Sequence, residues 1–477
     1  MLYAFTNSAS ASPPPLPDGG YPNFNTAEGD NALFNLTSGS GNTANGASAL
    51  QNNMEGGNNT AIGFGALLNN TTGGYNTATG AGALLNNTTA DGNTATGSSA
   101  LERTTTGSSN TANGDNALQF NQTNNNNTAT GFNALRNNHA DNNTATGSGA
   151  LQNNNTGTNN TANGFQALFN STGQDNTATG AFALVSTTTG SGNTASGLLA
   201  LSANTSGFNN TASGNRVLQS ATTADGNTAT GSGALLNDNT GANNTANGLN
   251  ALFNNTTGAN NTASGNRALF NNRMGTSNIA LGSNAGANLT NGSNNIDIGA
   301  AGVAGEASTI RIGVQGTHTR TFVAGISGSP ITGTSVVVNN SGRLGTAPSS
   351  QRFKDEIKPM DKASEAILAL KPVIFRYKKE IDPAGTSQFG LVAEEVEKVN
   401  RDLVVHDKEG KPYSVRYDPV NAMLVNEFRK EYRKVQGLEA TIAELRPQIE
   451  ALTAGLWKVS AQLEASKSAP QVVVNDQ

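Results

Sequence analysis

The 477-residue sequence contains no cysteine, which excludes disulfide bonds, thiolate nucleophiles and cysteine-based zinc sites. Aromatic residues make up only 5% of the chain and charged residues 13%, whereas glycine, asparagine, threonine and alanine are abundant. No apolar run reaches the roughly 18 residues of a membrane-spanning helix. His139, His318 and His406 are scattered, so no metal site and no cofactor is expected. These features disfavour an ordinary globular enzyme.

Lysine is also absent from the first 348 residues, which carry eight arginines and thirteen acidic residues. The rest of the chain carries twenty basic and twenty acidic residues, so the net charge of -5 falls on the first part. No basic stripe is present, and nucleic-acid binding is therefore disfavoured.

A short repeat fills most of the lysine-free part. Its core, NTA-x-G, begins at fifteen asparagines from Asn25 to Asn261, spaced 17 residues apart with two spacings of 16. Most units carry Ala-Leu seven and eight residues after the asparagine. A fixed short period of this kind is typical of a solenoid. Three degenerate units, NIALG, NIDIG and TIRIG, follow and begin at Asn278, Asn295 and Thr309.

One such unit cannot fold alone, because ordering it costs on the order of 1.5 kcal/mol per residue while it buries little apolar area. In a β-solenoid, each turn pairs its backbone with the turns above and below, and identical side chains form ladders. Asparagine and glycine suit the corners of such a turn, and threonine suits its short strands. The repeat therefore predicts a β-solenoid.

The degenerate units predict which way the strand side chains point. Positions one and three after the leading residue are mostly threonine, asparagine or serine in the regular units but isoleucine or leucine in the degenerate ones. Position two becomes Asp297 and Arg311 there. Because alternate strand residues share a face, we predict that positions one and three, and hence the threonines, point inward. Outward threonines would instead form the flat ladder typical of an ice-binding surface.

The repeats resemble the left-handed β-roll head of YadA-like trimeric surface adhesins over about residues 25–313. NIALGSNAG, at residues 278–286, is the segment most similar to the units of that family, and the NTA-x-G units are a more polar variant. The resemblance implies that three chains pack their rolls about one axis.

The remaining sequence predicts a mixture of short elements. RTFVAGI and TSVVVNN predict short strands that form a neck over residues 314–348. DKASEAILAL predicts a short helix that begins at Asp361 and ends before Pro372. VIFRYK predicts a strand, GLVAEEVEKVN a helix, and LVVHDKEGKPYSVRYD a hairpin that turns at residues 409–410.

Asp418 and Pro419 are a suitable N-cap and first residue for a long helix. Apolar residues then alternate at the a and d positions of a coiled coil, whose β-branched a and leucine d positions favour a dimer by packing rules. The alternative is a single amphipathic helix that packs on its own domain. Pro447 lies at position f and is expected to kink or split the helix. The a and d residues are Phe428, Val435, Ile442, Ile449, Leu456 and Leu463, with Leu438, Leu445, Leu452 and Val459.

SSQRFKDEIKP, FGLVAEEVEKV and YDPVNAMLVNE occur in this order within about residues 349–465. They resemble the intramolecular chaperone domain of the peptidase S74 family, found at the ends of phage endosialidase tailspikes, other tail fibres and myelin regulatory factor. The resemblance implies a trimeric domain that assembles the upstream β-fibre and then cuts itself off with a Ser-Lys dyad. The matching residues are Ser349 and Lys354, and the bond cut would join Pro348 to Ser349.

The implied chemistry suits these residue types. A serine hydroxyl is a weak nucleophile, and a lysine acts as its base only where desolvation lowers the lysine pKa. Attack by Ser349 on the carbonyl of Pro348 would leave an ester that water resolves. Arg352 keeps the arginine of the family and is a candidate supporting residue, whereas Ser350 stands where the family usually has aspartate.

Together these features predict a mainly β, homotrimeric extracellular fibre or adhesin that lies on a bacterial surface or virion tail. It would bind a surface receptor or glycan and catalyse only its own cleavage. The alternatives are a phage or prophage tail fibre with the same chaperone, and a structural or ice-binding solenoid.

The N-terminus lacks the basic and apolar regions of a secretory signal, which predicts another export route, an upstream start or release by lysis. The predicted segments are an N-terminal Pro/Gly-rich segment (residues 1–24), a β-solenoid of the left-handed β-roll type (25–313), a β-rich neck (314–348), a small α+β chaperone domain (349–425), a trimeric coiled coil (426–465) and a flexible tail (466–477).

Overall fold

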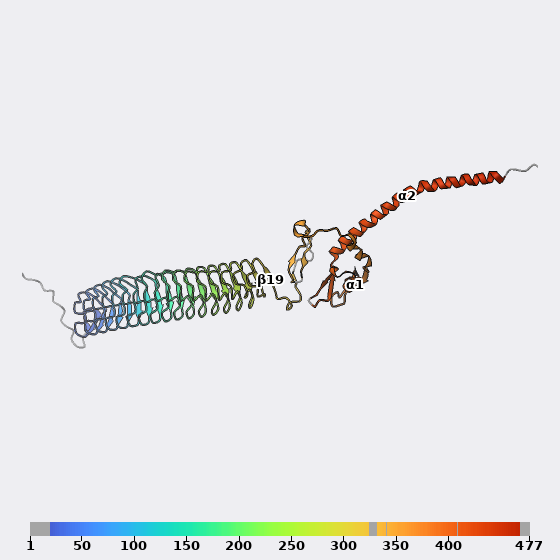
Figure 1. Ribbon diagram of the computed structural model, residues 1–477. Coiled ribbons are helices and arrows are strands. Elements are labelled where there is room, and N and C mark those ends of the chain that lie inside the picture. Colours follow the sequence, from blue (N-terminus) through green and yellow to red (C-terminus); the bar gives the residue numbers. More distant parts are fainter. Residues whose placement is uncertain (1–19, 324–331, 340, 408, 468–477) are drawn as a thin grey trace, which may run out of the picture. The chain divides into compact units, whose positions relative to one another are not determined.

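A computed structural model shows the arrangement of the chain (Figure 1), which divides into two compact units, Met1–Phe322 and Val323–Gln477. Much of the predicted N-terminal segment and most of the predicted tail lie outside the described residues. The structure describes residues 20–323, 332–339, 341–407 and 409–467.

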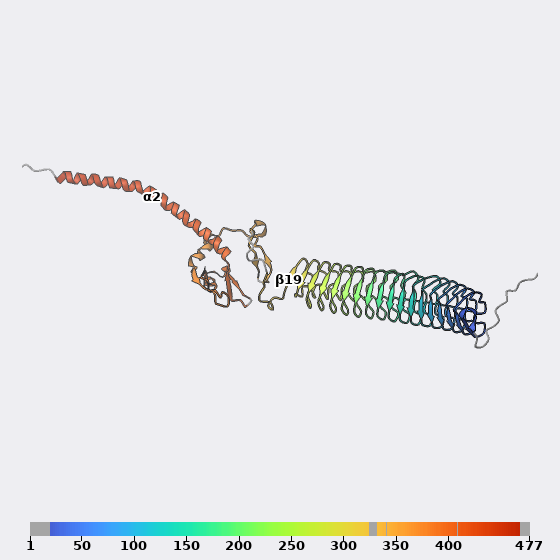
Figure 2. The same ribbon diagram turned by 180° about the vertical axis from the view of Figure 1, so that it is seen from behind.

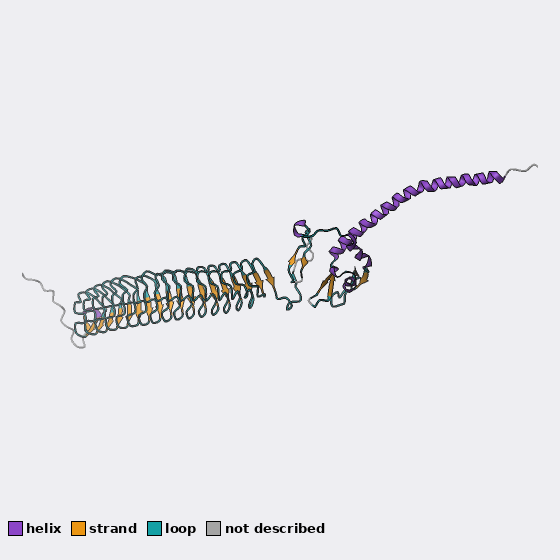
Figure 3. Ribbon diagram, in the orientation of Figure 1, coloured by secondary structure: helices purple, strands orange, loops and turns teal. Residues whose placement is uncertain are grey.

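The first unit is a β-solenoid in which each turn contributes one short strand to a single 19-stranded sheet (Figure 3). From β2 onward the strands follow one another in parallel and in register, so that Thr144 lies beside Thr161 and Ala145 beside Ala162. β1 (Gly20–Tyr21) pairs antiparallel with β2 at the N-terminal edge. The short helix η1 is Pro22–Phe24, and the parallel strands are β2 (Asn25–Glu28), β3 (Thr43–Asn45), β4 (Thr60–Ile62), β5 (Thr77–Thr79), β6 (Thr94–Thr96), β7 (Thr111–Asn113), β8 (Thr128–Thr130), β9 (Thr144–Thr146), β10 (Thr161–Asn163), β11 (Thr177–Thr179), β12 (Thr194–Ser196), β13 (Thr211–Ser213), β14 (Thr228–Thr230), β15 (Thr245–Asn247), β16 (Thr262–Ser264), β17 (Ile279–Leu281), β18 (Ile296–Ile298) and β19 (Ile310–Ile312).

The core of the solenoid is a set of alanine and leucine ladders. In the turn that contains β9, Ala145, Ala150 and Leu151 are completely buried, and their equivalents are buried along the stack. Leu151 has a φ of 50°, a left-handed conformation that costs a non-glycine residue roughly 1–2 kcal/mol. Burial of a leucine side chain contributes about 1.5–3 kcal/mol and offsets this cost. The predicted parallel β-solenoid is confirmed.

Buried asparagines hold the corners, as predicted. The Oδ1 of Asn143 accepts the backbone N–H of Asn160 at 3.0 Å, and its Nδ2 donates to the carbonyl of Gly157 at 3.0 Å. A second row lies eleven residues after nine of the fifteen leading asparagines, where, for example, Nδ2 of Asn154 donates to Oδ1 of Asn138 at 2.8 Å. Because corner backbone groups lack strand partners, these amides satisfy groups that would otherwise be buried without a hydrogen bond.

The prediction that the strand threonines point inward is wrong. In every strand from β3 to β18 the middle residue is buried and its two neighbours are exposed or half-buried. Thr144 and Thr146 therefore point outward while Ala145 points inward, and Ile279 and Leu281 of the degenerate units also lie outside. The interior beside the sheet holds small side chains, and the large aliphatic pairs mark the outer face. The solenoid thus presents an outward Thr-x-Thr ladder.

Close stacking of turns depends on the glycine that ends each strand. Gly147 has a φ of 131°, and a Cβ there would lie 2.5 Å from the carbonyl oxygen of Gly164 in the next turn. We expect Gly147→Ala to force the turns apart and to lower the free energy of unfolding by about 1–3 kcal/mol. A lower thermal midpoint would measure this loss. Gly149→Asn is the matched control, because the φ of 66° at Gly149 suits asparagine and Asn133 occupies the same place in the preceding unit. Equal losses for both variants would disprove this explanation.

Asp238 interrupts the second row of buried asparagines. Its Oδ1 accepts the backbone N–H of Gly241 at 3.0 Å and Nδ2 of Asn255 at 2.9 Å. Its Oδ2 has no partner among the described residues. Burial raises the pKa of Asp238 to about 8, although the bonds from Asn255 and Gly241 act in the opposite direction. The folded chain therefore holds a proton that the unfolded chain releases above about pH 4.

We expect Asp238→Asn to stabilise the solenoid at neutral pH. Because the folded-state pKa of this acid is raised, its contribution to stability is greatest below the unfolded pKa and is lost as the pH rises toward 8. An asparagine needs no proton here, and its Nδ2 can donate to Gly241 as Asn255 does to Gly258. The free energy of unfolding of wild type should fall between about pH 5 and pH 8 by up to about 4 kcal/mol more than that of the variant, or about 1.4 kcal/mol per pH unit. Parallel pH profiles would contradict this prediction.

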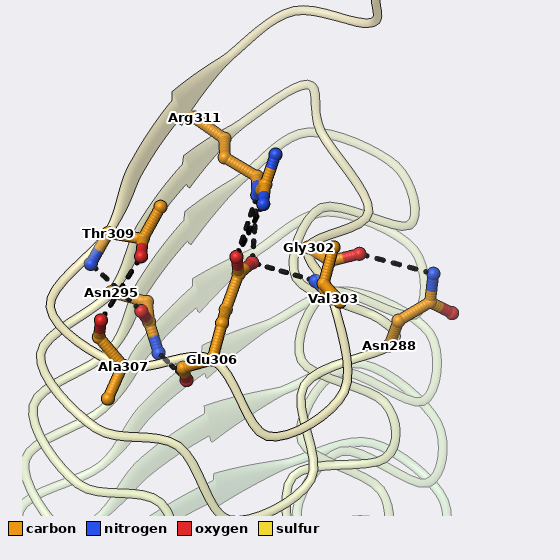
Figure 4. Close-up of polar contacts among 8 residues, drawn as sticks. All are labelled: Asn288, Asn295, Gly302, Val303, Glu306, Ala307, Thr309 and Arg311. Atoms are coloured by element: carbon orange, nitrogen blue, oxygen red, sulfur yellow. Dashed lines mark hydrogen bonds and ion pairs between the residues drawn. The ribbon is translucent and has the colours of Figure 1, made fainter. Parts of the chain in front are cut away.

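An ion pair lies at the C-terminal end of the solenoid (Figure 4). Arg311 donates from Nε and Nη2 to the carboxylate of Glu306 at 2.6–2.9 Å, and this bond is the main reason that the pKa of Glu306 is lowered. Asp297, on the preceding strand, is buried where other turns have alanine, and neither of its carboxylate oxygens has a partner in the described part of the chain. Burial and then Glu306 raise the pKa of Asp297 to about 6, against the effect of Arg311.

The predicted neck contains few strands in its described residues. β20 (Val337–Val338) pairs antiparallel with β21 (Leu344–Gly345), and Gln315 forms an isolated bridge with His318. The predicted RTFVAGI strand is not formed over residues 320–323, and its last residues lie outside the described part.

The second unit contains a small α+β domain and one long helix. Its elements follow the predicted order, except that the helix at Asp361 is a 3-10 helix. A small apolar core forms around Val396, Leu403 and Val415. The elements are η2 (Gln351–Phe353), η3 (Asp361–Ala369), β22 (Val373–Phe375) paired with β23 (Gln388–Gly390), α1 (Ala393–Val399), η4 (Arg401–Leu403), β24 (Val404–His406) paired with β25 (Pro412–Val415), and α2 (Tyr417–Lys467).

Helix α2 continues through Pro447, so the proline does not split it, although the helix bends along its length in both views (Figures 1 and 2). All ten predicted a and d residues are exposed, by 46–75%. The helix packs on its own domain only near its N-terminal end, where Met423 is buried. The alternative of a helix that packs along its own domain is therefore not supported.

Candidate functional site

Ser349 and Lys354 flank the single turn of η2. The backbone N–H of Phe353 donates to the carbonyl of Ser350 at 3.1 Å, and that of Lys354 donates to the carbonyl of Gln351 at 3.0 Å. Ser350 has an extended backbone, with φ of -64° and ψ of 142°, so the chain enters the turn directly from an extended segment. Within the described residues, no hydrogen bond joins the side chains of Ser349 and Lys354.

The bond between Pro348 and Ser349 is accessible. Every described residue from 341 to 359 is exposed, including both residues of this bond. Solvent exposure alone does not start the reaction, because a base must also remove the proton of the Ser349 hydroxyl.

Lys354 is exposed in the single chain, so the described residues do not supply the desolvation that a lysine base needs. The neighbouring apolar side chains Phe353 and Ile357 are 58% and 62% exposed. The guanidinium of Arg352 lies 4.6 Å from the ring centroid of Phe353 rather than on the predicted dyad. The predicted site residues are thus close in sequence and accessible, but a single chain does not assemble them.

A second serine and lysine, which the sequence analysis does not predict as a pair, lie close together inside the domain. Ser364 on η3 is completely buried; its hydroxyl bonds to Glu427, accepts Nδ2 of Asn426 at 2.7 Å and lies 3.5 Å from Nζ of Lys430. Lys430 also donates to Glu427 at 2.7 Å and to Glu365 at 3.3 Å. The bond to Glu427 is the main reason that the pKa of Lys430 is raised. A lysine held in its charged form cannot act as a base, so this serine and lysine do not form a catalytic pair. The hydrogen bonds of the cluster join η3 to α2 instead.

An apolar groove of about 480 Å³ lies beside this cluster, between η3, the β22–β23 hairpin and the start of α2. Phe389 and Ile374 line it and are largely exposed, and the hydroxyl of Tyr417 accepts the backbone N–H of Leu391 at 3.1 Å. The groove contains no cluster of ionisable side chains in its lining. Its chemistry fits an apolar partner segment rather than a charged substrate.

In the part of the chain that the structure describes, no three histidine or acidic side chains come together as a metal site. None of the described helices has the length and apolar character needed to cross a membrane.

The peptidase S74 family model, described as the chaperone of endosialidase, matches residues 349–405. The match begins at Ser349 and includes the first two of the three predicted motifs, while the third lies beyond it. Comparison with curated proteins and with solved structures finds no match. The predicted resemblance to the chaperone domain is therefore confirmed for these residues, and the resemblance of the solenoid to adhesin heads stays a prediction.

Proposed function

We propose that the chain is a homotrimeric extracellular fibre whose C-terminal domain assembles three shafts and then releases itself by cutting before Ser349. The observation that carries this proposal is the match of residues 349–405 to the chaperone of endosialidase, in a chain whose preceding unit is a long β-solenoid. The shaft supplies length, and a receptor or glycan on another surface would be its target.

Three shafts of this kind can pair in the wrong register. Its turns are so similar that a slip of one unit, 17 residues, brings equivalent side chains back into place. Parallel pairing is also slow to form. A helical clamp at one end of the chain would start all three copies at the same turn, which is the role expected of an intramolecular chaperone.

Helix α2 has the surface that such a clamp requires. A single chain leaves an apolar a and d stripe in water along most of the helix, and stripes of this kind mark contacts between proteins. Two further copies of the helix would cover it as a trimeric coiled coil. The apolar groove beside η3 offers a second place for a neighbouring copy to pack.

Assembly would also complete the cleavage site. Burial of Lys354, Phe353 and Ile357 by neighbouring copies would disfavour the charged form of the lysine. The neutral Nζ of Lys354 then takes the proton of Ser349 Oγ, which attacks the carbonyl carbon of Pro348. The C–N bond breaks, the amine of Ser349 takes a proton, and water hydrolyses the resulting ester to leave a carboxylate and a free hydroxyl. Cleavage would thus follow correct assembly.

Light scattering of the Ser349→Ala protein tests the assembly directly. We expect a particle of three times the chain mass of 48.6 kDa. Leu445→Asp with Leu452→Asp would place charges in the seam and should give monomers, whereas Ala443→Asp, outside the seam, should leave the trimer intact. A monomeric Ser349→Ala protein at micromolar concentration would overturn the trimer, and a dimer would favour the packing-rule alternative.

A phage or prophage tail fibre is one form of this proposal, because it would use the same shaft and the same chaperone. Genes for other tail proteins beside this one would identify it.

A further inference from the structure

The outward sheet face, defined as strand positions one and three of β3 to β19, changes character toward its C-terminal end. Threonine occupies position one from β3 to β16, and isoleucine replaces it in β17, β18 and β19. Five of the six side chains that these last strands contribute are 38–71% exposed, and the sixth is half-buried. The strands lie about 4.8 Å apart, so the side chains form one continuous aliphatic patch. The patch consists of Ile279, Leu281, Ile296, Ile298, Ile310 and Ile312.

This face also carries no charge. Positions one and three contain no ionisable residue from Thr43 to Ile312, although other surfaces of the same turns carry Asp115, Arg136 and Arg216. Around a rotation axis each side chain on the interface meets its own copy, so any charge there would meet the same charge. A surface that only faces water gains solubility from charges. The neutral face therefore fits a contact between identical chains.

Other exposed apolar residues of the shaft outside the strands form smaller groups. Phe64 and Phe132 are four repeat units apart, and Phe165 contacts Phe182 of the next turn as a ring pair, with centroids 5.2 Å apart. Isolated exposed residues of this kind need no partner, whereas a continuous patch marks an interaction site.

We propose that the outward sheet face is the surface through which copies of this chain pack, with the aliphatic patch as its anchor and the threonine ladder as its continuation. This inference rests on the proposed trimer and adds which face of the solenoid lies on the axis. In the sequence, the patch is the last part of the solenoid before the C-terminal unit, which is expected to bring the copies together. Isoleucine and leucine pack less well against threonine turns than against their own copies, so the patch favours the native register once the C-terminal unit holds the copies together. Facing threonines then pack through methyl groups and bond through hydroxyls.

Single cysteines test this placement, because the chain has none of its own. In the Ser349→Ala background, Ile296→Cys and Thr144→Cys mark the outward sheet face, and Asn155→Cys marks an exposed loop of the same turn as Thr144. Leu452→Cys in α2 reports on assembly itself. Under mild oxidation we expect most chains of the two face variants and of Leu452→Cys to give disulfide-linked dimers, at a yield at least tenfold above that of Asn155→Cys.

The outcomes separate the two proposals. Cross-linking at Leu452→Cys without cross-linking at either face position would overturn the sheet-face interface and leave the trimer standing. A monomer without any cross-link would overturn both. Cross-linking of Asn155→Cys instead of the face variants would place the loops on the axis and also overturn the inference.

A second readout does not depend on cysteine. Threonines left in water at regular spacing would form a flat array suited to ordered water, and thermal hysteresis of the trimer would then overturn the self-contact in favour of ice binding. Ile296→Lys should place like charges together and lower the thermal midpoint of the trimer, whereas Asn155→Lys should not. Equal midpoints for the two lysine variants would also count against the sheet-face contact.

Discussion

Wild-type protein is expected to separate, without added protease, into a fragment that ends at Pro348 and a 129-residue fragment that begins SSQRFK. Ser349→Ala removes the nucleophile and should abolish cleavage. Lys354→Ala removes the base and should slow cleavage by at least about 10²–10⁴-fold, the usual contribution of general base catalysis. Denaturing gels and the mass of each fragment would measure both effects. The two variants should still form trimers, because assembly depends on packing and not on the dyad.

Neighbouring residues of the same type provide matched controls for this experiment. Ser350→Ala and Lys358→Ala remove a serine and a lysine that lie within four residues of the dyad, and both proteins should still cleave. The seam variant Leu445→Asp with Leu452→Asp should remain uncleaved even though its dyad is intact, since a single chain leaves Lys354 exposed. Full-length wild-type chain that persists after complete folding would disprove the catalytic assignment.

The solenoid could be predicted from the sequence because its evidence is periodic. A spacing of 17 residues, small side chains and regular asparagines leave few alternatives to a stack of pairing turns. The sequence predicts the wrong direction for the strand side chains, because large aliphatic residues such as Ile279 and Leu281 normally indicate burial within one chain. The narrow interior holds alanine at Ala280 instead, and the aliphatic residues lie on the outer face.

The C-terminal domain shows a different limit of sequence analysis. Its motifs and their order identify the chaperone part, and the positions of the helices and hairpins follow from proline, glycine and apolar patterns. The cluster around Ser364 could not be predicted, because it depends on α2 bringing Glu427 against η3 from 63 residues away. The proposed dyad shows the same limit, because the described chain leaves Lys354 exposed and the desolvation that we propose for it would come from other copies.

Cleaved fibre is expected to fail to refold after denaturation, whereas the Ser349→Ala protein should recover at least partly. Once the chaperone domain has left, an unfolded shaft keeps only its repeats, and every shift of 17 residues gives nearly the same pairing. The native register is then one of many similar arrangements, and the folded shaft persists because unfolding is slow. The uncleaved protein keeps the seam of α2, which can bring three chains together at one end before the slow parallel pairing begins.

Both proteins should be unfolded in guanidinium, diluted to the same concentration, and compared by light scattering and circular dichroism. Lys354→Ala is the control that separates the linkage from the serine: it should refold like Ser349→Ala, because it too keeps the chaperone attached. The wild-type shaft should yield aggregates or mixed species with β structure and little particle of trimer mass, since paired but misregistered turns still form strands. Equal recovery of cleaved and uncleaved protein would show that the shaft finds its register unaided, and the clamp would then have no folding role.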